Sequence, residues 1–328
     1  MKILVTGATG FVGGNLAKTL IARGADLRLM VREPEKLKKQ GIVCDDIVVG
    51  DITDAAAVKQ AAAGVDIIYA IAGTFREPNL SDERYREVNV KACELMAEAG
   101  IEAGAKRLVF CSTGGIHGPN DGTKPTHEDD PLLGEGIYEI SKAEGDTTIL
   151  NYGKAGKIET VCIRPAPIYG PGDDRLVKLF KIAGKTKPMM LGDGTAPYHM
   201  IYIDDLSDAF IKAGETPGLQ SEAFLIGGPD KPSRNELFTE IGKILGIENQ
   251  AIRRLPAWPF FIAGDICEAI CRPFNIAPPI YRRRVEFFTA HRNYSTAKAE
   301  QMLGFTGATG FKEGLAKTAE WYKSENLI

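Results

Sequence analysis

Short apolar runs alternate with stretches of helical periodicity through the first half of the chain. The runs are Ile3–Val5, Leu27–Val31, Ile47–Ile52, Asp66–Ala70, Arg107–Cys111 and Ile158–Ile163. Short, mostly apolar runs of this kind are expected of strands buried on both faces of a parallel sheet, and the segments between them have helical spacing. The pattern predicts an α/β fold with a doubly wound parallel sheet and helices on both faces.

A glycine-rich turn, Thr6–Gly13, joins the first predicted strand to the first predicted helix. Gly7, Gly10 and Gly13 stand where the chain turns tightly, where backbone approaches a ligand and where helix lies close to strand, so a Cβ atom would interfere at each. Free amides in the first helical turn, together with the helix dipole, bind a pyrophosphate. We therefore expect a Rossmann domain that binds a dinucleotide through Gly7, Thr9, Gly10, Phe11, Val12 and Gly13.

The opening hexapeptide Thr-Gly-Ala-Thr-Gly-Phe occurs a second time, at Thr306–Phe311. No apolar strand precedes this copy, and Lys312, Glu313 and Gly314 follow it. Because the motif is informative only between a strand and a helix, we predict that the second copy is a loop.

Regular alternation weakens after Pro165, where prolines end the sixth strand. We expect residues 1–165 to form the NAD(P)-binding domain, with a further strand near 223–227. Residues 166–222 and 228–328 are then mainly a smaller C-terminal substrate-binding lobe.

The ends of the second and third strands are expected to meet the adenosine of the dinucleotide. Arg32 ends the second strand, and its planar, permanently charged fork suits the 2′-phosphate of NADP. No carboxylate stands at this strand-end position to repel a phosphate, so NADP is favoured over NAD, although a solvated arginine at a strand end is the alternative. Asp51 is placed to receive the adenine amino group, and small or apolar neighbours approach the cofactor at Ile52, Ala72 and Gly73.

Two later segments carry polar groups that a sheet does not require. Ser112, Thr113 and Gly114 follow the fifth strand, at the edge where open parallel sheets bind ligands. Tyr138 and Lys142 are four residues apart and so share one helical face. A phenol titrates near 10, so a neighbouring ammonium and a positive nicotinamide would favour the phenolate that acid–base catalysis needs.

The same tyrosine–lysine spacing recurs at Tyr294 and Lys298. This copy follows the end of the strand–helix alternation and has no hydroxyl-bearing strand end before it. We interpret it as the surface start of a helix capped by Ser295 or Thr296.

Aromatic and aliphatic residues gather between prolines at 255–279. They are consistent with the lining of an apolar substrate cleft, with contact to a membrane surface or with ordinary core packing of a small lobe.

Composition narrows the class of protein. The 328 residues are 44% hydrophobic and 25% charged, with a formal net charge of −3, and the basic residues are scattered rather than gathered into a nucleic-acid surface. No apolar run is long enough to span a bilayer, and the amino terminus is too short to be a signal peptide, so a cytoplasmic protein without stable membrane insertion is expected. The six cysteines show no metal-binding spacing and the four histidines are dispersed, which predicts reduced thiols and no metal.

Taken together, these motifs resemble the extended short-chain dehydrogenase/reductases over essentially the whole chain. The resemblance rests on the glycine turn, the Ser112-Thr113 strand end, Tyr138-x-x-x-Lys142 and the run from Arg164 to Pro171, and extends to Gly192–Gly194 and Ile203–Asp205. It implies an NAD(P)-dependent enzyme with Tyr138 as general acid/base, Lys142 holding the nicotinamide ribose and Thr113 binding the substrate oxygen.

The resemblance further implies that Asn89 steadies the active-site helix and that Pro165 borders the cofactor. It also implies a homodimer formed through the two long helices after the fourth and fifth strands.

Two departures bear on the substrate, for which Gly114, Pro167 and Tyr198 are further candidates. Nucleotide-sugar epimerases and dehydratases usually carry an asparagine and an arginine where Pro167 and Tyr198 stand, and neither replacement neutralises a diphosphate. The chain is therefore more similar to the 3β-hydroxysteroid dehydrogenase and dihydroflavonol reductase branch. This favours hydride transfer to or from a largely apolar secondary alcohol or ketone of steroid, flavonoid or β-keto type. A nucleotide-sugar epimerase or dehydratase with tightly bound NAD is the first alternative, and a non-catalytic NADP-sensing protein is the second.

Overall fold

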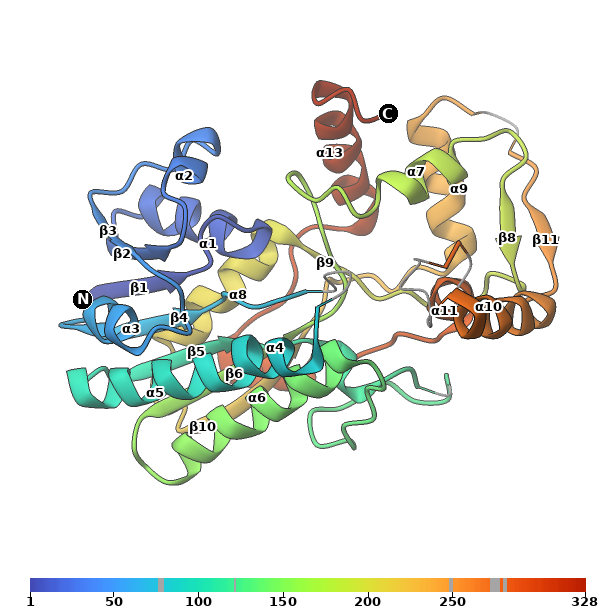
Figure 1. Cartoon of the computed structure of the whole chain (residues 1–328). Helices are drawn as coiled ribbons and strands as arrows, with labels where there is room; N and C mark the ends of the chain where they lie inside the picture. Colours follow the sequence, from blue (N-terminus) through green and yellow to red (C-terminus); the bar gives the residue numbers. More distant parts are fainter. Residues whose placement is uncertain (76–79, 121, 248–249, 272–277, 280–281) are drawn as a thin grey trace.

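The computed structural model describes residues 1–75, 80–120, 122–247, 250–271, 278–279 and 282–328. Seven parallel strands form the central sheet in the order β10-β6-β5-β4-β1-β2-β3 (Figure 1). These strands are β1 Lys2–Thr6, β2 Asp26–Val31, β3 Asp46–Val49, β4 Ile67–Ala70, β5 Arg107–Cys111, β6 Glu159–Pro165 and β10 Ser221–Ile226. The strand order reverses at β1, which confirms the predicted doubly wound sheet and includes the expected seventh strand.

Helices cover both faces of this sheet. Those of the first half are α1 Phe11–Ala22, α2 Glu35–Lys39, α3 Ala55–Ala62, α4 Asp82–Arg86, α5 Ala92–Ala103 and α6 Ile137–Lys154, with a π-helical turn at Glu87–Lys91 and a 3₁₀ turn at Gly114–His117. Successive strand residues enter opposite cores: Ile3 and Val5 join the core that includes α1, whereas Leu4 joins the core that includes α3 and α5. Continuous apolar strands are needed because both faces are buried.

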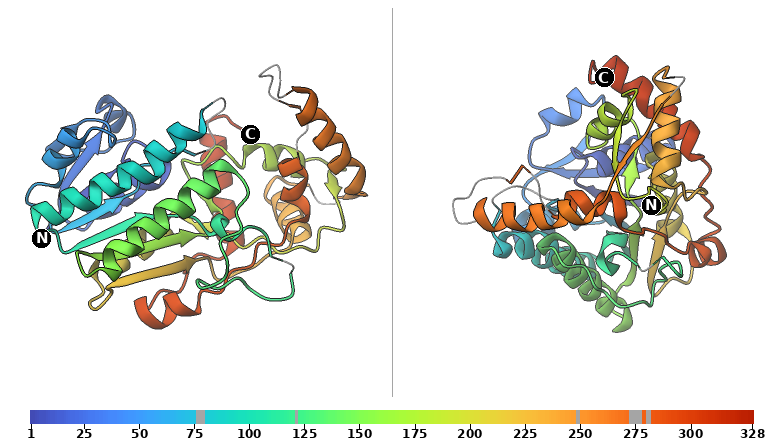
Figure 2. Two further views of the ribbon diagram at one scale, coloured as in Figure 1. Left: turned by 60° about the horizontal axis from the view of Figure 1, so that its bottom comes forward. Right: turned by 90° about the vertical axis from the view of Figure 1, so that its right-hand side faces the viewer.

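The second half of the chain builds two further two-stranded sheets, β7–β9 and β8–β11. Its elements are β7 Ile168–Tyr169, α7 Val177–Ala183, β8 Met189–Leu191, β9 Ile201–Tyr202, α8 Ile203–Glu215, α9 Arg234–Ile244, β11 Arg253–Leu255, α10 Trp258–Cys271, α11 Arg282–Thr289, α12 Ala297–Leu303 and α13 Phe311–Ser324. Most lie beside the carboxyl ends of the strands, with α10 and β11 at the end remote from the amino terminus (Figures 1 and 2).

Two of these helices pack on the central sheet rather than in the lobe. Helix α8 contacts α1, β5 and β6, and α12 contacts β10. Buried residues of α8, such as Leu206 and Phe210, belong to the same core as Val5 of β1. The division of the chain at residue 165 into two domains stays a prediction, and the packing shows that later segments return to cover the sheet.

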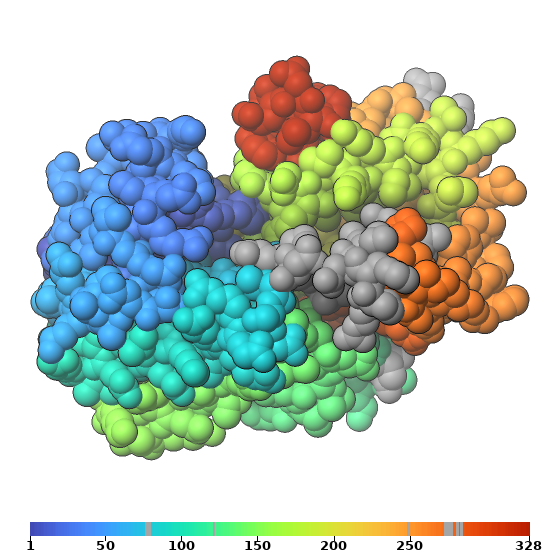
Figure 3. Space-filling view, viewed as in Figure 1, coloured from blue at the N-terminus to red at the C-terminus, as the bar shows by residue number. Residues whose placement is uncertain are grey.

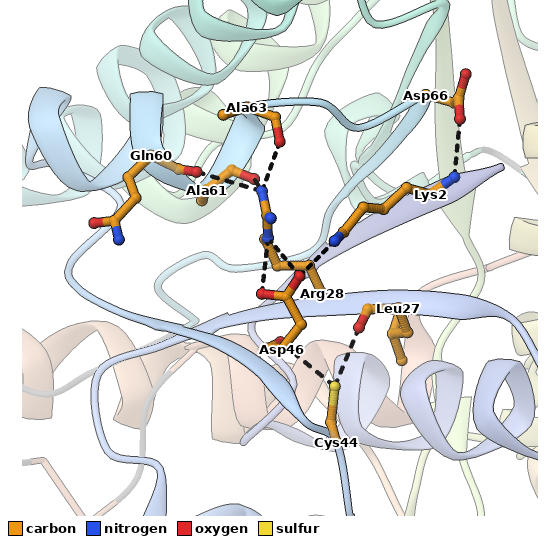
Figure 4. A network of polar contacts seen from close by, with 9 residues as sticks. All are labelled: Lys2, Leu27, Arg28, Cys44, Asp46, Gln60, Ala61, Ala63 and Asp66. Atoms are coloured by element: carbon orange, nitrogen blue, oxygen red, sulfur yellow. Dashed lines mark hydrogen bonds and ion pairs between the residues drawn. The ribbon is translucent and has the colours of Figure 1, made fainter.

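Charged side chains fasten the amino ends of the first strands (Figure 4). Arg28 donates to Asp46 at 3.0 and 3.1 Å, and its other end donates to the carbonyl oxygens of Ala61 and Ala63 at the end of α3. Lys2 reaches Asp46 at 2.6 Å. Hydrogen bonds from Arg28 and Lys2 hold the pKa of the Asp46 carboxyl below its ordinary value. The network ties β1, β2, β3 and α3 together at the edge opposite the site.

Three expectations are corrected by the fold. The second hexapeptide is a loop only to Gly310, because Phe311 begins α13. Tyr294 is not at the surface: it is 1% exposed, and α12 starts at Ala297 with no side-chain capping bond from Thr296. The long-range packing described below buries this tyrosine.

The apolar region at 255–279 is described except for residues 272–277. Within its described part, α10 exposes one stripe of large side chains at a spacing of four: Trp258, Ile262, Ile266 and Ile270. These residues do not line the cavity described below. Among the helices that the structure describes, none combines the length and the apolar character needed to cross a bilayer.

The cysteines have no disulfide partners among the described residues, but they are not all core thiols. Cys93, Cys111 and Cys162 are buried, whereas Cys44, Cys267 and Cys271 are partly exposed.

Candidate active site

A cavity of about 810 Å³ lies where the carboxyl ends of the strands meet the lobe. Figure 3 shows the molecule hollowed between the blue amino-terminal part and the yellow-green and red segments of the second half. Of the predicted site residues, Asn89 and Gly114 do not line this cavity. All the others do: Gly7, Thr9, Gly10, Phe11, Val12, Gly13, Arg32, Asp51, Ile52, Ala72, Gly73, Thr113, Tyr138, Lys142, Pro165, Pro167 and Tyr198.

Gly7 and Gly13 of the turn must be glycines, because neighbouring backbone leaves no room for a Cβ atom at either position. Gly7 has a φ of +73°, and a Cβ there would lie 2.8 Å from the backbone nitrogen of Ala72. A Cβ on Gly13 would lie 2.4 Å from the carbonyl oxygen of Gly7. Thr6 at the end of β1 accepts hydrogen bonds from the amides of Ile71 and Ala72, both at 3.1 Å. The turn is therefore locked against the end of β4.

The first turn of α1 faces the cavity, and no side chain in the described part of the protein caps it. Gly10 is the N-cap residue and, having no side chain, it makes no capping bond. Phe11 and Val12, which begin the helix, line the cavity. A glycine surface without Cβ atoms and an uncapped helix amino terminus fit the pyrophosphate of a dinucleotide.

Four charged side chains border the end of the cavity beside β2 and β3. Arg32 and Arg84 lie 3.7 and 3.9 Å from one carboxylate oxygen of Asp51, and Lys36 lines the same end. Asp51 uses its other oxygen to accept two bonds from Thr53. Burial opposes the charge of Asp51, but these hydrogen bonds and the two arginines lower the pKa of its carboxyl.

The expectation that no carboxylate stands near Arg32 is therefore wrong. β3 lies beside β2, so the end of β3 brings Asp51 within 3.7 Å of Arg32. Lys36 and Arg84 were missed, although Lys36 follows Arg32 by four residues. Two of these cations have carboxylate partners of their own, Lys36 with Glu33 at 2.6 Å and Arg84 with Glu87 at 2.7 Å.

Helix α6 presents Tyr138 and Lys142 to the cavity beside Thr113. The Lys142 side chain is 4% exposed, and its Nζ lies 4.3 Å from the centroid of the Phe110 ring. Thr113 follows β5 and accepts a bond from the amide of Gly115 at 3.1 Å. The ring of Phe75 packs edge-on against Tyr138, with centroids 4.9 Å apart. A hydroxyl, a phenol and an ammonium thus line one cavity.

Asn89 lies behind the cavity and connects two of its walls. Its side chain donates to the Thr74 carbonyl at 3.2 Å and to the Ser141 hydroxyl at 3.0 Å, and accepts from the Thr74 amide at 3.0 Å. Ser141 in turn donates to the carbonyl of Tyr138. Asn89 lies in the π-helical turn and is 1% exposed. Its bonds therefore fix the segment that carries Tyr138.

A buried ion pair anchors the other side of α6. Arg164 of β6 donates to both carboxylate oxygens of Asp146, at 3.0 and 2.7 Å, and to the Glu128 carbonyl. It also lies 3.3 Å from His117 Nε2. Burial, and then the charge of Arg164, lowers the pKa of His117. Because bidentate pairs are geometrically specific, this contact fixes α6 relative to β6.

The opposite end of the cavity is lined by Pro167, Ile168, Tyr198 and Phe287 and by two residues that were not predicted, Arg292 and Tyr294. Tyr294 packs against Gly114, since a Cβ on that glycine would lie 2.9 Å from the tyrosine Cζ. No sequence signal identifies Arg292, which reaches the site only through the pairing of its backbone with Pro197 and His199.

Arg175 was also missed. Its guanidinium lies 5.4 Å from the ring centroids of Phe11 and Phe75, and it donates to Asp173 at 2.5 Å. It thereby connects the lobe to the first turn of α1.

The model of the NAD dependent epimerase/dehydratase family matches residues 3–227. Among curated relatives, a 2-alkyl-3-oxoalkanoate reductase of Stenotrophomonas maltophilia is 30% identical and covers 97% of this chain and 98% of its own. A 3beta-hydroxysteroid-dehydrogenase/decarboxylase of Arabidopsis thaliana is 25% identical over 97% of this chain, which spans only 61% of that protein. A UDP-glucose 4-epimerase of Mycolicibacterium smegmatis is 26% identical, and the match covers 99% of this chain and 100% of that protein.

Solved structures share the fold over nearly the whole chain. A dTDP-glucose 4,6-dehydratase of Streptomyces venezuelae with NAD and TYD bound gives a TM-score of 0.77 at 22% identity, covering 100% of both chains. A UDP-glucose 4-epimerase of Thermotoga maritima with UDP-glucose gives 0.76 at 22% identity, covering 99% of this chain and 100% of its own.

Proposed function

Because the chain belongs to the NAD-dependent epimerase/dehydratase family, we propose that it interconverts a secondary alcohol and a ketone on a largely apolar small molecule, with NADP as the hydride carrier. The chain is an enzyme of this family, whose members among its relatives are dehydrogenases, epimerases and dehydratases. The observation that carries the proposal is the meeting of Thr113, Tyr138 and Lys142 in one cavity with the glycine turn.

In this proposal, Thr113 and Tyr138 hold the substrate oxygen, and Tyr138 passes the proton to it during ketone reduction or removes it during alcohol oxidation. Lys142 supplies positive charge beside the phenol and holds the nicotinamide ribose. When bound, the nicotinamide donates or accepts the hydride. Asn89 and the Arg164–Asp146 pair position the helix that carries Tyr138 and Lys142.

Two observations support an apolar substrate. Pro167, Ile168 and Phe287 line the far end of the cavity, with Tyr198 packed edge-on against Phe287 at 5.2 Å between centroids. A 30% identical relative is named as a 2-alkyl-3-oxoalkanoate reductase, and a 25% identical relative, of which this chain spans 61%, is named as a 3beta-hydroxysteroid-dehydrogenase/decarboxylase.

The preference for NADP rests on the charges at the adenosine end. Arg32, Lys36 and Arg84 lie at this end with Asp51, and Lys36 and Arg84 also pair with Glu33 and Glu87. A 2′-phosphate brings about two negative charges to this place, and the Arg32 side chain, which is 70% exposed and 3.7 Å from Asp51, has a planar fork to bind it. With bound NADP, the Arg32 fork would hold the phosphate.

A nucleotide-sugar epimerase is the second candidate, and the relative from Mycolicibacterium smegmatis favours it. Tyr198 and Pro167 stand at the positions where such enzymes usually hold the diphosphate, and this argues against it.

A substrate screen tests the reaction. Purified protein is assayed with NADP and NAD against hydroxysteroids, 3-hydroxy acids and their esters, dihydroflavonols and UDP-glucose. We expect alcohol oxidation that Tyr138→Phe reduces by about 10³-fold while NADPH binding is retained. Turnover of UDP-glucose alone, or full activity of the phenylalanine variant, contradicts the proposal.

The cofactor preference is tested separately by titrating NADPH and NADH. Replacing Arg32 and Lys36 together by alanine should weaken NADPH binding by about 100-fold and leave NADH binding within about two-fold. Equal loss for both nucleotides would show that these side chains do not contact the 2′-phosphate.

We also propose a homodimer formed through α5 and α6, which lie side by side on one face of the sheet (Figure 1). Light scattering gives the mass in solution, and a monomer at micromolar concentration contradicts it.

A further inference from the structure

Two arginines lie near the far end of the cavity and differ in how their guanidinium groups are used. Arg234 is fully buried and donates to the carbonyl oxygens of Phe287, Ala196, Pro197 and Ala290. Backbone oxygens therefore occupy most of its five donors. Arg234 does not line the cavity, and its function is to hold the lobe together.

Arg292 lines the cavity, and its side chain has one partner among the described residues, the phenol oxygen of Tyr294. Within the described ranges no carboxylate lies at ion-pair distance from it. Burial opposes its charge, but Tyr294, Tyr198 and Glu139 outweigh this and raise the pKa of the guanidinium. A permanently charged group with spare donors thus faces a largely apolar part of the cavity.

The backbone fixes Arg292 in this place. Its amide donates to the Pro197 carbonyl at 3.2 Å, and its carbonyl accepts from the His199 amide at 2.9 Å. The Tyr294 ring that bonds the guanidinium packs against Gly114, the residue after Thr113. Arg292 and Thr113 line the same cavity, so the positive charge and the hydroxyl that is expected to bind the reacting oxygen face one space.

We propose that Arg292 binds a carboxylate of the substrate, so that the enzyme acts on a hydroxy acid or oxo acid whose carboxylate lies within a few bonds of the reacting carbon. This inference rests on the proposed function and identifies its substrate class. A guanidinium without an ion-pair partner in a partly apolar cavity is strongly favoured by an anionic ligand, and its planar fork matches a carboxylate. The alternative anion is the diphosphate of a nucleotide sugar.

The charge balance favours the carboxylate. Of the other cations that line the cavity, Arg32, Lys36 and Arg84 gather at the adenosine end, Arg175 pairs with Asp173, and Lys142 stands beside Tyr138. Among described residues this leaves one arginine at the substrate end, and the buried Glu139 carboxylate, whose charge acts on Arg292, lines the same cavity. With one cation and one carboxylate at this end, a ligand with a single negative charge is accommodated more readily than a diphosphate, which brings two.

Calorimetry on the protein loaded with NADP⁺ tests the proposal without requiring turnover. The probes are 3-hydroxydecanoate, its methyl ester and UDP-glucose, and the variants are Arg292→Gln, Arg292→Lys and the exposed control Arg253→Gln. We expect wild-type protein and the control to bind the acid at least about 10-fold more tightly than the ester. Arg292→Gln should remove this difference without weakening ester binding, and Arg292→Lys should retain part of it.

Equal binding of acid and ester by the wild-type protein overturns the inference, as does equal weakening of both by Arg292→Gln. Binding of neither, or an Arg292-dependent affinity for UDP-glucose alone, overturns it as well. Oxidation of the bound probes, followed as NADPH formation, distinguishes a failure of this inference from a failure of the proposed function. Turnover of acid and ester at equal efficiency leaves the proposed reaction standing and removes only the function of Arg292.

Discussion

Thr6–Phe11 and Thr306–Phe311 contain the same six residues, and each is followed by a helix that begins at its phenylalanine. Glycine is the N-cap residue in both, at Gly10 and Gly310. The first copy follows β1 and opens on the cavity, whereas no strand directly precedes the second. The two copies have the same local sequence in different surroundings.

The surroundings decide what the backbone amides bind. In the second copy, Asp205 accepts hydrogen bonds from the amides of Ala308 and Thr309 at 3.1 and 2.8 Å, and Asp230 accepts from the amide of Phe311 at 2.8 Å. No described carboxylate contacts the corresponding amides of the first copy. A helix amino terminus attracts an anion in either case. The protein supplies that anion at α13 and leaves the place at α1 for a ligand.

The third glycine of the motif marks the same difference. Gly13 lies against the carbonyl of Gly7, whereas the matching position after the second copy is Glu313, which is exposed and pairs with Lys317. Close approach of helix and strand is therefore needed only where the strand is present.

Gly13→Ala should produce the largest effect. A Cβ at this position would lie 2.4 Å from the Gly7 oxygen and 2.6 Å from its carbonyl carbon, so the turn must move. We expect NADPH binding to weaken by more than about 100-fold and the free energy of unfolding to fall by about 3 kcal/mol. Fluorescence titration and urea denaturation measure the two quantities.

The matched control is Glu313→Ala. It removes one exposed ion pair and should change stability by less than about 0.5 kcal/mol and NADPH binding not at all. A comparable loss of NADPH binding in the control would mean that the two copies act together, which contradicts the comparison.

The stability of the protein should depend on pH through His199, which is buried beside Gly228, where Gly307 of the second copy packs. His199 Nε2 lies 2.8 Å from the Gly228 carbonyl, and the Tyr294 amide approaches its Nδ1 at 3.4 Å, so the buried ring is neutral with its proton on Nε2. Burial lowers the pKa of His199 from 6.5 to about 4. Gly307 packs directly on Gly228, with a Cβ position 2.9 Å from its Cα.

Because the unfolded chain binds this proton more readily, stability contributed by neutral His199 is complete above about pH 6.5 and is lost as the pH falls toward 4. The full loss is about 3 kcal/mol. Urea denaturation at several pH values should show a slope that His199→Gln removes, whereas the exposed His127→Gln variant keeps it. An unchanged slope in the His199 variant would assign the acid sensitivity to other groups.

The comparison also shows which features of the structure could be predicted from the sequence. Strands and the glycine turn were predictable because their residues act on near neighbours: Ile3 to Val5 form β1, and Gly7 and Gly13 contact each other. Tyr138 and Lys142 were predictable because helical spacing puts them on one face.

Contacts between distant segments were not predictable in this way. Asp205 bonds the amides of Ala308 and Thr309, about one hundred positions later, in the loop that directly precedes α13. Arg292 and Tyr294 enter the cavity only because their strand-like segment pairs with residues 197–199. Neither spacing nor composition carries that information, since it depends on how the lobe folds back on the sheet.

Asp205→Ala should have a smaller effect that is confined to the second copy. The change leaves the Ala308 amide, the Thr309 amide and the Thr309 hydroxyl without their acceptor. We expect a loss of about 2 kcal/mol in the free energy of unfolding, because these donors are partly buried, and no change in NADPH affinity. Urea denaturation and NADPH titration measure the two quantities.

Formate sharpens this prediction. If the amides of the second copy attract an anion as those of the first copy do, a small carboxylate should occupy the place of the deleted side chain and raise the melting temperature of Asp205→Ala. Chloride at equal ionic strength should not, and the wild-type protein, whose site already contains Asp205, should respond to neither salt. Equal responses of variant and wild type would show that the second copy has no anion site of its own. The two helix amino termini would then share their sequence but not the ability to bind an anion.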